Sequence, residues 1–96
     1  MSQKDYLIKA REDVAWRAIE GQAVIVDGRF DKVHTLNPVA TTVWKKIQDE
    51  INFDRLVLEL GEKYEAAKSV LMKDVRELVD RFQEEQLLTG SFHDTP

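Results

Sequence analysis

The sequence of 96 residues predicts one α+β domain, in which a three-stranded antiparallel sheet is followed by three helices that cover one of its faces. Short strand-like runs separated by glycine-containing turns occupy the chain up to residue 36. Beyond it, apolar side chains recur at three- and four-residue steps, which is the spacing of a buried helix face. A chain of this length forms a single small core. We expect an N-terminal lead-in over residues 1–10, the domain over residues 11–90 and a flexible tail over residues 91–96.

The predicted strands form a meander. Residues 14–19 mix Val, Trp and Ile with Ala and Arg, and residues 23–26 are a run of Ala, Val, Ile and Val. Glu20 and Gly21 between them predict a tight turn, because glycine adopts positive φ without strain. Asp27 and Gly28 predict a second two-residue turn, after which residues 29–36 return as the third strand.

The third strand leads directly into a helix. Asn37 has a short side chain that caps helices, and Pro38 suits the first helical position, where its missing N–H costs nothing. This helix is expected to run from Pro38 to about Glu50. Its buried face is predicted from the spacing of five apolar residues: Val39, Ala40, Val43, Trp44 and Ile47.

Two more helices are predicted after a short connection. The second begins near the capping residue Asn52 and continues through Gly61, which lowers helix stability by about 1 kcal/mol relative to alanine. The third is expected over residues 67–86. Its buried face consists of Leu71, Val75, Leu78, Val79 and Phe82.

Composition excludes several classes of function. The chain has no cysteine, and its net charge of −4 comes from interspersed acidic and basic residues, which disfavours nucleic acid as a partner. His34 and His93 are too far apart to propose a metal site or a catalytic triad from spacing, and no glycine-rich phosphate-binding loop is present. The sequence also lacks a signal peptide and a membrane-spanning run. We therefore expect a cytoplasmic, non-catalytic protein with no metal, cofactor or membrane partner.

In a meander, the third strand lies at a border of the sheet. Its outward N–H and C=O groups are then free to pair with another chain. The two-residue period makes His34 and Leu36 share one hydrogen-bonding side, while Val33 and Thr35 share the other. Which of the two sides faces outward depends on the hairpin register.

Several residues give the chain a resemblance to a known family. They are the run Arg-x-x-Val-x-Trp-Arg-x-Ile-x-Gly from Arg11 to Gly21, the step from Leu36 to Asn37 followed by Ala40 and Trp44, Tyr64 at the end of the second helix, Asp74, Val75, Leu78 and Phe82 in the third, and the closing Leu87 and Leu88. Over residues 11–88 this pattern resembles the PqqD-like family, also called RiPP recognition elements.

The resemblance implies a winged helix-turn-helix-like fold that binds the leader segment of a ribosomally made precursor peptide. The leader adds as a strand beside the third strand, in a groove completed by the third helix, and its core is presented to a modifying enzyme such as a radical SAM enzyme or a leader peptidase. The implied peptide-binding residues are Lys32, Val33, His34, Thr35, Leu71, Asp74, Val75, Leu78 and Val79. A DNA-binding winged helix and a structural subunit of a biosynthetic complex are the alternatives.

Overall fold

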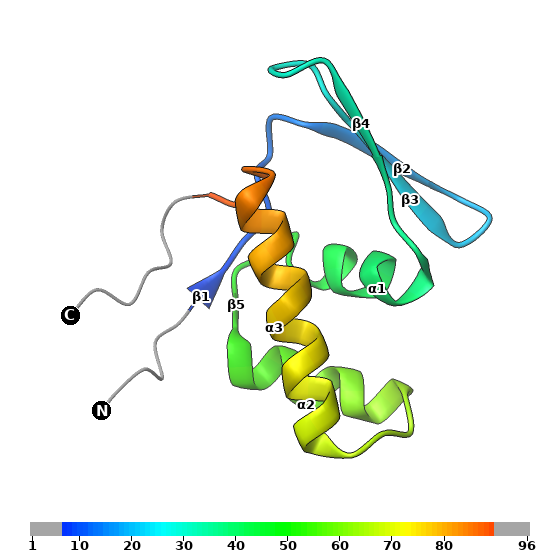
Figure 1. Ribbon diagram of the computed structural model, residues 1–96, viewed down its shortest axis with the longest axis vertical. Helices are drawn as coiled ribbons and strands as arrows, with labels where there is room; N and C mark the ends of the chain where they lie inside the picture. The colour runs from blue at the N-terminus through cyan, green and yellow to red at the C-terminus, as the bar shows by residue number, and fades with distance from the viewer. Residues whose placement is uncertain (1–6, 90–96) are drawn as a thin grey trace.

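The computed structural model describes residues 7–89 and contains the expected three-stranded antiparallel sheet with three helices (Figure 1). Strands β2 (Ala15–Ile19), β3 (Gln22–Asp27) and β4 (Lys32–Thr35) are ordered β2-β3-β4. The α+β class is therefore confirmed. The first six residues of the predicted lead-in, residue 90 and the predicted tail lie outside the described residues, and so does His93.

The turn between β2 and β3 is the predicted two-residue turn. Ile19 pairs with Gln22, and both connecting residues have positive φ, 53° at Glu20 and 82° at Gly21. Two successive residues in this region give the right-handed twist that a hairpin requires.

The predicted two-residue turn at Asp27 and Gly28 is wrong. Asp27 pairs with Lys32, so the connection has four residues, 28–31, and β4 begins at Lys32 rather than at Arg29. The Asp27 carboxylate accepts hydrogen bonds from the backbone N–H of Arg29 at 3.0 Å and from its guanidinium, and Asp31 has a positive φ of 58°. A side chain that bonds its own following backbone favours a longer turn.

Helix α1 (Pro38–Lys46) begins as predicted, because the Asn37 side chain accepts a hydrogen bond from the Ala40 N–H at 2.8 Å. It ends four residues earlier than expected. The Gln48 side chain donates to the Trp44 carbonyl at 2.9 Å and satisfies one of the carbonyl groups that a helix end leaves open.

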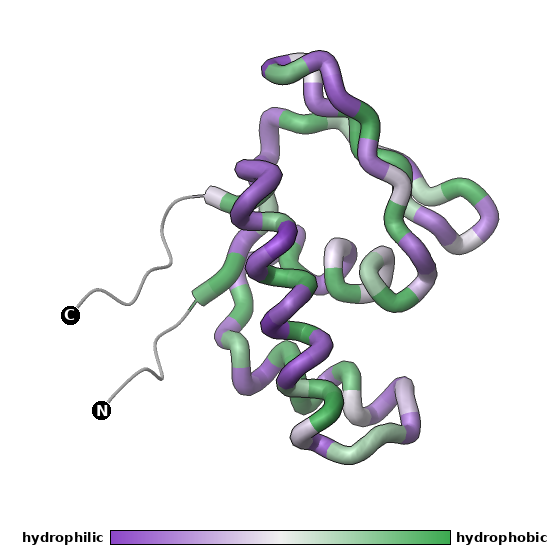
Figure 2. Tube along the Cα trace, in the orientation of Figure 1, coloured by the Kyte–Doolittle hydropathy of each residue, from purple (hydrophilic) through white to green (hydrophobic). Residues whose placement is uncertain are grey.

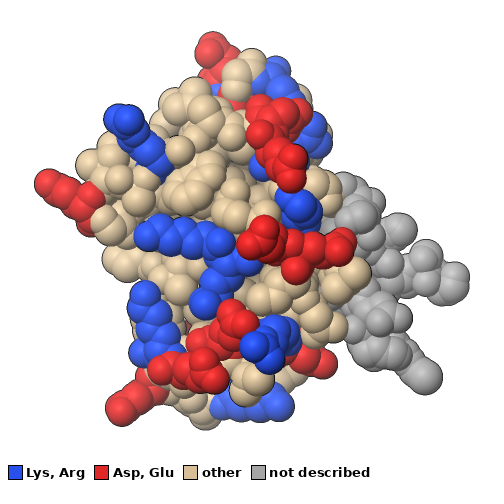
Figure 3. Space-filling view, turned by 180° about the vertical axis from the view of Figure 1, so that it is seen from behind, with Lys and Arg blue, Asp and Glu red and all other residues tan. Residues whose placement is uncertain are grey.

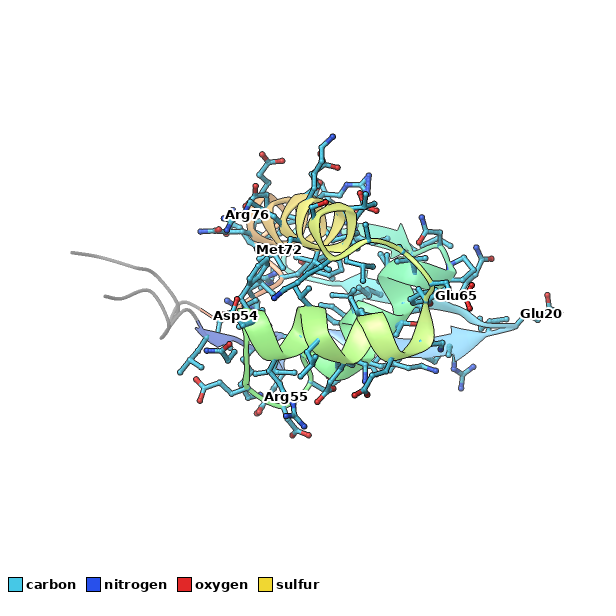
Figure 4. All side chains as sticks on the ribbon, turned by 90° about the horizontal axis from the view of Figure 1, so that it is seen from below. Glu20, Asp54, Arg55, Glu65, Met72 and Arg76 are labelled. Carbon is cyan, nitrogen blue, oxygen red and sulfur yellow. The ribbon has the colours of Figure 1, made fainter. Side chains whose placement is uncertain are left out.

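Helix α2 (Phe53–Lys63) starts at the predicted cap, since Asn52 accepts from the N–H groups of Asp54 and Arg55. Helix α3 (Lys68–Glu84) follows Ala67, whose side chain makes no capping bond, and it ends two residues before the predicted Gln86. Figure 4 shows α2 and α3 next to each other, with side chains filling the space between them.

A second, two-stranded sheet was not predicted. Strand β1 (Leu7–Ile8) pairs with β5 (Ile51–Asn52), and Ile8 is fully buried. Ala10 forms a bridge with Leu88, so the described N-terminal segment lies against the residues that follow α3. Two-residue strands have no periodicity by which sequence could identify them.

The core is centred on Trp44, whose side chain is fully buried. Its ring meets Trp16 edge-on, with centroids 6.3 Å apart, and Phe82 at 5.4 Å. These contacts join the inner face of the sheet to α1 and α3. Hydrophilic and hydrophobic residues alternate along α3 in Figure 2, as expected for a helix with one buried face. No helix within residues 7–89 is long and apolar enough to cross a membrane.

Candidate peptide-binding groove

Strand β4 has β3 on one side only, so its other edge is unpaired within the sheet. The Leu36 N–H donates to the Ala23 carbonyl at 2.8 Å, next to the pairs Val24 with Thr35 and Ile25 with His34. Because hydrogen bonding alternates along an antiparallel strand, His34 also directs its N–H and C=O toward β3. Val33 and Thr35 therefore direct theirs to the open edge.

The first hairpin gives the same assignment. The residues that flank a two-residue turn form a hydrogen-bonded pair, here Ile19 with Gln22. Alternation then directs Val24 and Val26 toward β2, which leaves Ala23 and Ile25 to bond β4.

A hollow of about 400 Å³ lies between α3 and the start of α1. It is lined by Asn37, Val39, Asp74, Glu77, Leu78 and Arg81. Val39 is 41% exposed and Leu78 is half-buried, so the hollow presents apolar surface between polar walls. We call the space between the open edge of β4 and this wall of α3 and α1 the groove.

His34 lies on the inner face of the sheet, because its partner in the register, Ile25, is fully buried. The side chain is half-buried, and its Nε2 atom is enclosed without a hydrogen-bond partner among the described residues. Val33 occupies the opposite face and is 65% exposed. The side chains of His34 and Val33 therefore lie on opposite faces of the sheet.

The β3–β4 loop is attached to the C-terminal end of α3. The Arg29 guanidinium donates to both oxygens of the Asp27 carboxylate, at 2.9 and 2.7 Å, and to the Gln86 carbonyl at 2.7 Å. These hydrogen bonds from Arg29 lower the pKa of the inaccessible Asp27 carboxyl, and the nearby His34 adds a smaller effect in the same direction. Lys32 also reaches Glu85 at 3.4 Å. These contacts position β4 relative to α3.

The other end of β4 is fixed by Thr41 of α1. Its buried hydroxyl accepts from the Ala23 N–H at 2.8 Å and lies 3.4 Å from the Leu36 carbonyl. Thr41 thereby links the start of α1 to β3 and to the residue that follows β4.

The structure divides the expected peptide-binding residues into three groups. Asp74 and Leu78 line the hollow, and Lys32, Val33, His34 and Thr35 form β4. The remaining three, Leu71, Val75 and Val79, are buried in the core and support α3 from behind.

Four residues of the hollow were missing from the expected set: Asn37, Val39, Glu77 and Arg81. The helical period contained a signal for two of them, because Asp74, Glu77, Leu78 and Arg81 follow the i, i+3, i+4, i+7 spacing of one face. The described residues hold no group of three or more His, Cys, Asp or Glu side chains that would suit a metal ion.

Comparison with solved structures shows that this fold is shared. TbiB1 in complex with the TbiA(beta) leader peptide aligns with a TM-score of 0.80 at 16% identity, over 88% of this chain and 99% of that one. A lasso peptide synthetase B1 complexed with the leader peptide aligns with a TM-score of 0.75 at 20% identity, over 85% and 96%.

The PqqD truncation of Methylobacterium extorquens PqqCD, described as a functional and stand-alone RiPP recognition element, aligns with a TM-score of 0.71 at 16% identity, over 93% of this chain and 99% of that one. No curated protein matches the sequence. Residues 22–88 match the sequence family described as coenzyme PQQ synthesis protein D. The chain therefore belongs to the PqqD family.

Proposed function

We propose that residues 11–90 form a non-catalytic recognition module, which binds the leader segment of a ribosomally synthesised precursor peptide as an additional strand on β4. The module delivers the peptide to a modifying enzyme, for which a radical SAM enzyme and a leader peptidase are the candidate classes. The observation that carries this proposal is the unpaired edge of β4 together with the hollow beside α3, which Asn37, two residues beyond the strand, helps to line.

The two parts of the groove have different roles in binding. Val33 and Thr35 offer N–H and C=O groups to the main chain of any extended peptide, and such bonds contribute affinity with little sequence preference. The hollow beside Leu78 and Val39 accepts side chains that alternate along the added strand, and it contributes selectivity.

The proposal also has support from the comparisons. Two of the similar structures are complexes with leader peptides, and both share this fold. The family match covers β4, α1 and α3, which are the elements that build the groove.

The test is a titration of the purified protein with synthetic leader peptides from precursor genes that neighbour its own gene. Calorimetry is expected to show a dissociation constant in the micromolar range or lower. The amide NMR signals of Val33, Thr35 and Leu78 are expected to shift when the peptide is added. The protein alone is expected to leave the peptide chemically unchanged by mass spectrometry. Absence of heat and of shift changes for every neighbouring leader would overturn the proposal.

The surface charges suit duplex DNA less well than they suit a peptide. The exposed side of α3 interleaves Lys73, Arg76 and Arg81 with four acidic residues: Asp74, Glu77, Asp80 and Glu84. Positive and negative side chains are also interspersed on the face shown in Figure 3. Phosphate binding requires clustered positive charge, which neither surface provides. A purely structural subunit would need no open strand edge, whereas peptide binding does.

A further inference from the structure

The charges on the groove wall are separated along its length. Asp74 and Glu77 occupy one end of the hollow, and Arg81 lies one helical turn beyond Glu77. Asp74 and Arg81 are seven positions apart, which corresponds to about 10 Å along the helix axis. Leu78 lies between the two ends and provides the apolar surface.

The orientation of the groove follows from the places where the two ends of β4 lie along α3. Lys32, the first residue of β4, reaches Glu85 just after α3, whereas Asn37, which follows the strand, lines the hollow that extends back along α3 from Arg81 to Asp74. Strand β4 and helix α3 therefore run in opposite directions past each other, as Figure 1 also shows. The acidic end of the groove adjoins the start of α1, and the basic end, with Arg81 and Lys32, adjoins the β3–β4 loop.

These charged groups are available to a ligand. Among residues 7–89, Asp74, Glu77 and Arg81 have no ion-pair partner, although Glu77 and Arg81 are four residues apart on the helix. Lys32 has only the contact with Glu85 at 3.4 Å, in which both side chains are exposed by more than a third. A charged peptide side chain would therefore not have to displace an existing strong pair.

We infer that the groove selects peptide segments with a basic side chain over Asp74 and Glu77, an apolar side chain over Leu78 and an acidic side chain beside Arg81. This inference rests on the proposed function and names the leader chemistry that the groove accepts. Side chains on one face of a strand are two residues apart, about 6.6 Å, so the pattern is basic-x-apolar-x-acidic. For a peptide antiparallel to β4, the basic residue is the N-terminal one.

The experiment uses the full chain, immobilised, and a random peptide library displayed on its encoding RNA, so no natural leader has to be known. The enriched peptides are expected to carry the basic-x-apolar-x-acidic pattern and to lose enrichment on a Thr35→Pro variant. A selected peptide is then titrated against the double variant Asp74→Lys with Glu77→Lys. Its affinity should fall about fivefold or more, and a peptide with glutamate in place of its basic residue should recover that loss.

The matched control is the double variant Asp80→Lys with Glu84→Lys, which changes the net charge equally on the same helix but outside the hollow. It is expected to bind the original peptide within about twofold of the parent. Circular dichroism establishes that both variants are folded.

Each outcome separates the two proposals. Edge-dependent peptides without a charge pattern, or equal losses in the two double variants, would overturn the inference and leave the proposed function standing. If no enriched peptide depends on the β4 edge, the proposed function fails, and the inference fails with it.

Discussion

Proline substitutions on β4 test the docking edge directly, because proline removes one backbone N–H. His34 directs its N–H toward Ile25 of β3, whereas Thr35 directs its N–H outward. We therefore expect His34→Pro to damage the sheet, and Thr35→Pro to leave the domain folded but to weaken the addition of a strand.

The expected magnitudes follow from the group that each substitution leaves unpaired. In His34→Pro, the carbonyl of the fully buried Ile25 loses its donor, which costs about 1–3 kcal/mol. For a domain of this size, that loss lowers the melting temperature by about 4–24 °C. In Thr35→Pro, the missing donor faces solvent in the free protein, so the cost in stability is expected below about 1 kcal/mol. Peptide affinity should fall at least about tenfold, because a carbonyl of the added strand is left unpaired.

The assay combines thermal melting with peptide titration on four variants. Val33→Pro provides a second outward position in case Thr35→Pro distorts the step into α1. Ala18→Pro is the matched control, since its N–H points outward from the opposite edge of the sheet, on β2. It is expected to bind like the parent protein. If both outward variants of β4 fold and bind as tightly as the parent, β4 is not the docking edge and the groove assignment is wrong.

Three further predictions concern stability and specificity. Arg29 lowers the folded-state pKa of Asp27, so this pair stabilises the fold above about pH 4, and the contribution is lost as pH falls through the folded pKa. The melting temperature of Asp27→Asn should therefore fall less steeply with decreasing pH below pH 4 than the melting temperature of the parent protein does. Equal pH dependence in the two proteins would contradict this. Phe82→Ala should cost about 3–5 kcal/mol in urea unfolding followed by tryptophan fluorescence, because Phe82 is buried edge-on against Trp44, and a loss under about 1 kcal/mol would show that this packing contributes little. Duplex DNA at physiological salt should give only weak, sequence-independent gel shifts, and a sequence-specific shift would favour the DNA-binding alternative.

Local sequence signals were sufficient to predict helix starts and a turn where one residue type determines the backbone conformation. Asn37 with Pro38, and Asn52, marked the starts of α1 and α2, because capping requires a short acceptor at one position. Glu20 and Gly21 marked the first turn for a comparable reason. These signals were enough to predict the order of the main sheet and helices.

Tertiary contacts decided the features that were not predicted. Helix α1 ends early because Gln48 folds back onto the Trp44 carbonyl, and the following residues pair with β1, more than 40 positions earlier in the chain. The β3–β4 loop is long because Arg29 bonds both Asp27 and the distant Gln86 carbonyl. A side chain with two partners on separate elements cannot be assigned from the spacing of its neighbours.

Some groove residues were predicted from the sequence, and others depend on tertiary contacts. The family resemblance indicated Asp74 and Leu78 of α3, and both of these residues line the hollow. It did not indicate Asn37 and Val39, which line the hollow only because α1 starts next to α3 in space. It also assigned Val75 and Val79 to peptide binding, whereas their side chains are buried in the core. A helical period distinguishes faces, but it does not reveal what covers each of them.

The strand register could have been deduced from the sequence by treating the two hairpins together. A two-residue turn at Glu20 and Gly21 makes Gln22 part of a hydrogen-bonded pair with β2, so Val24 and Val26 also bond β2. A two-residue turn at Asp27 and Gly28 would require Val26 to bond the third strand as well, yet each residue has one N–H and one C=O on a single side of the strand. The two turns are therefore incompatible.

A four-residue loop removes this conflict, because it makes Asp27 the flanking residue, and Asp27 bonds away from β2. The same step directs His34 toward β3 and Val33 and Thr35 outward. The length of the β3–β4 loop, which does not line the hollow, thus determines which residues of β4 direct their N–H and C=O groups to the docking edge. Removing one residue from the β3–β4 loop would require a bulge or shift β4 by one position, which would exchange the inner and outer residues of the strand. A deletion of Phe30 is accordingly expected to abolish peptide binding even though every residue of β4 and of the hollow is retained, and unchanged affinity in a folded deletion variant would contradict this link between loop length and binding edge.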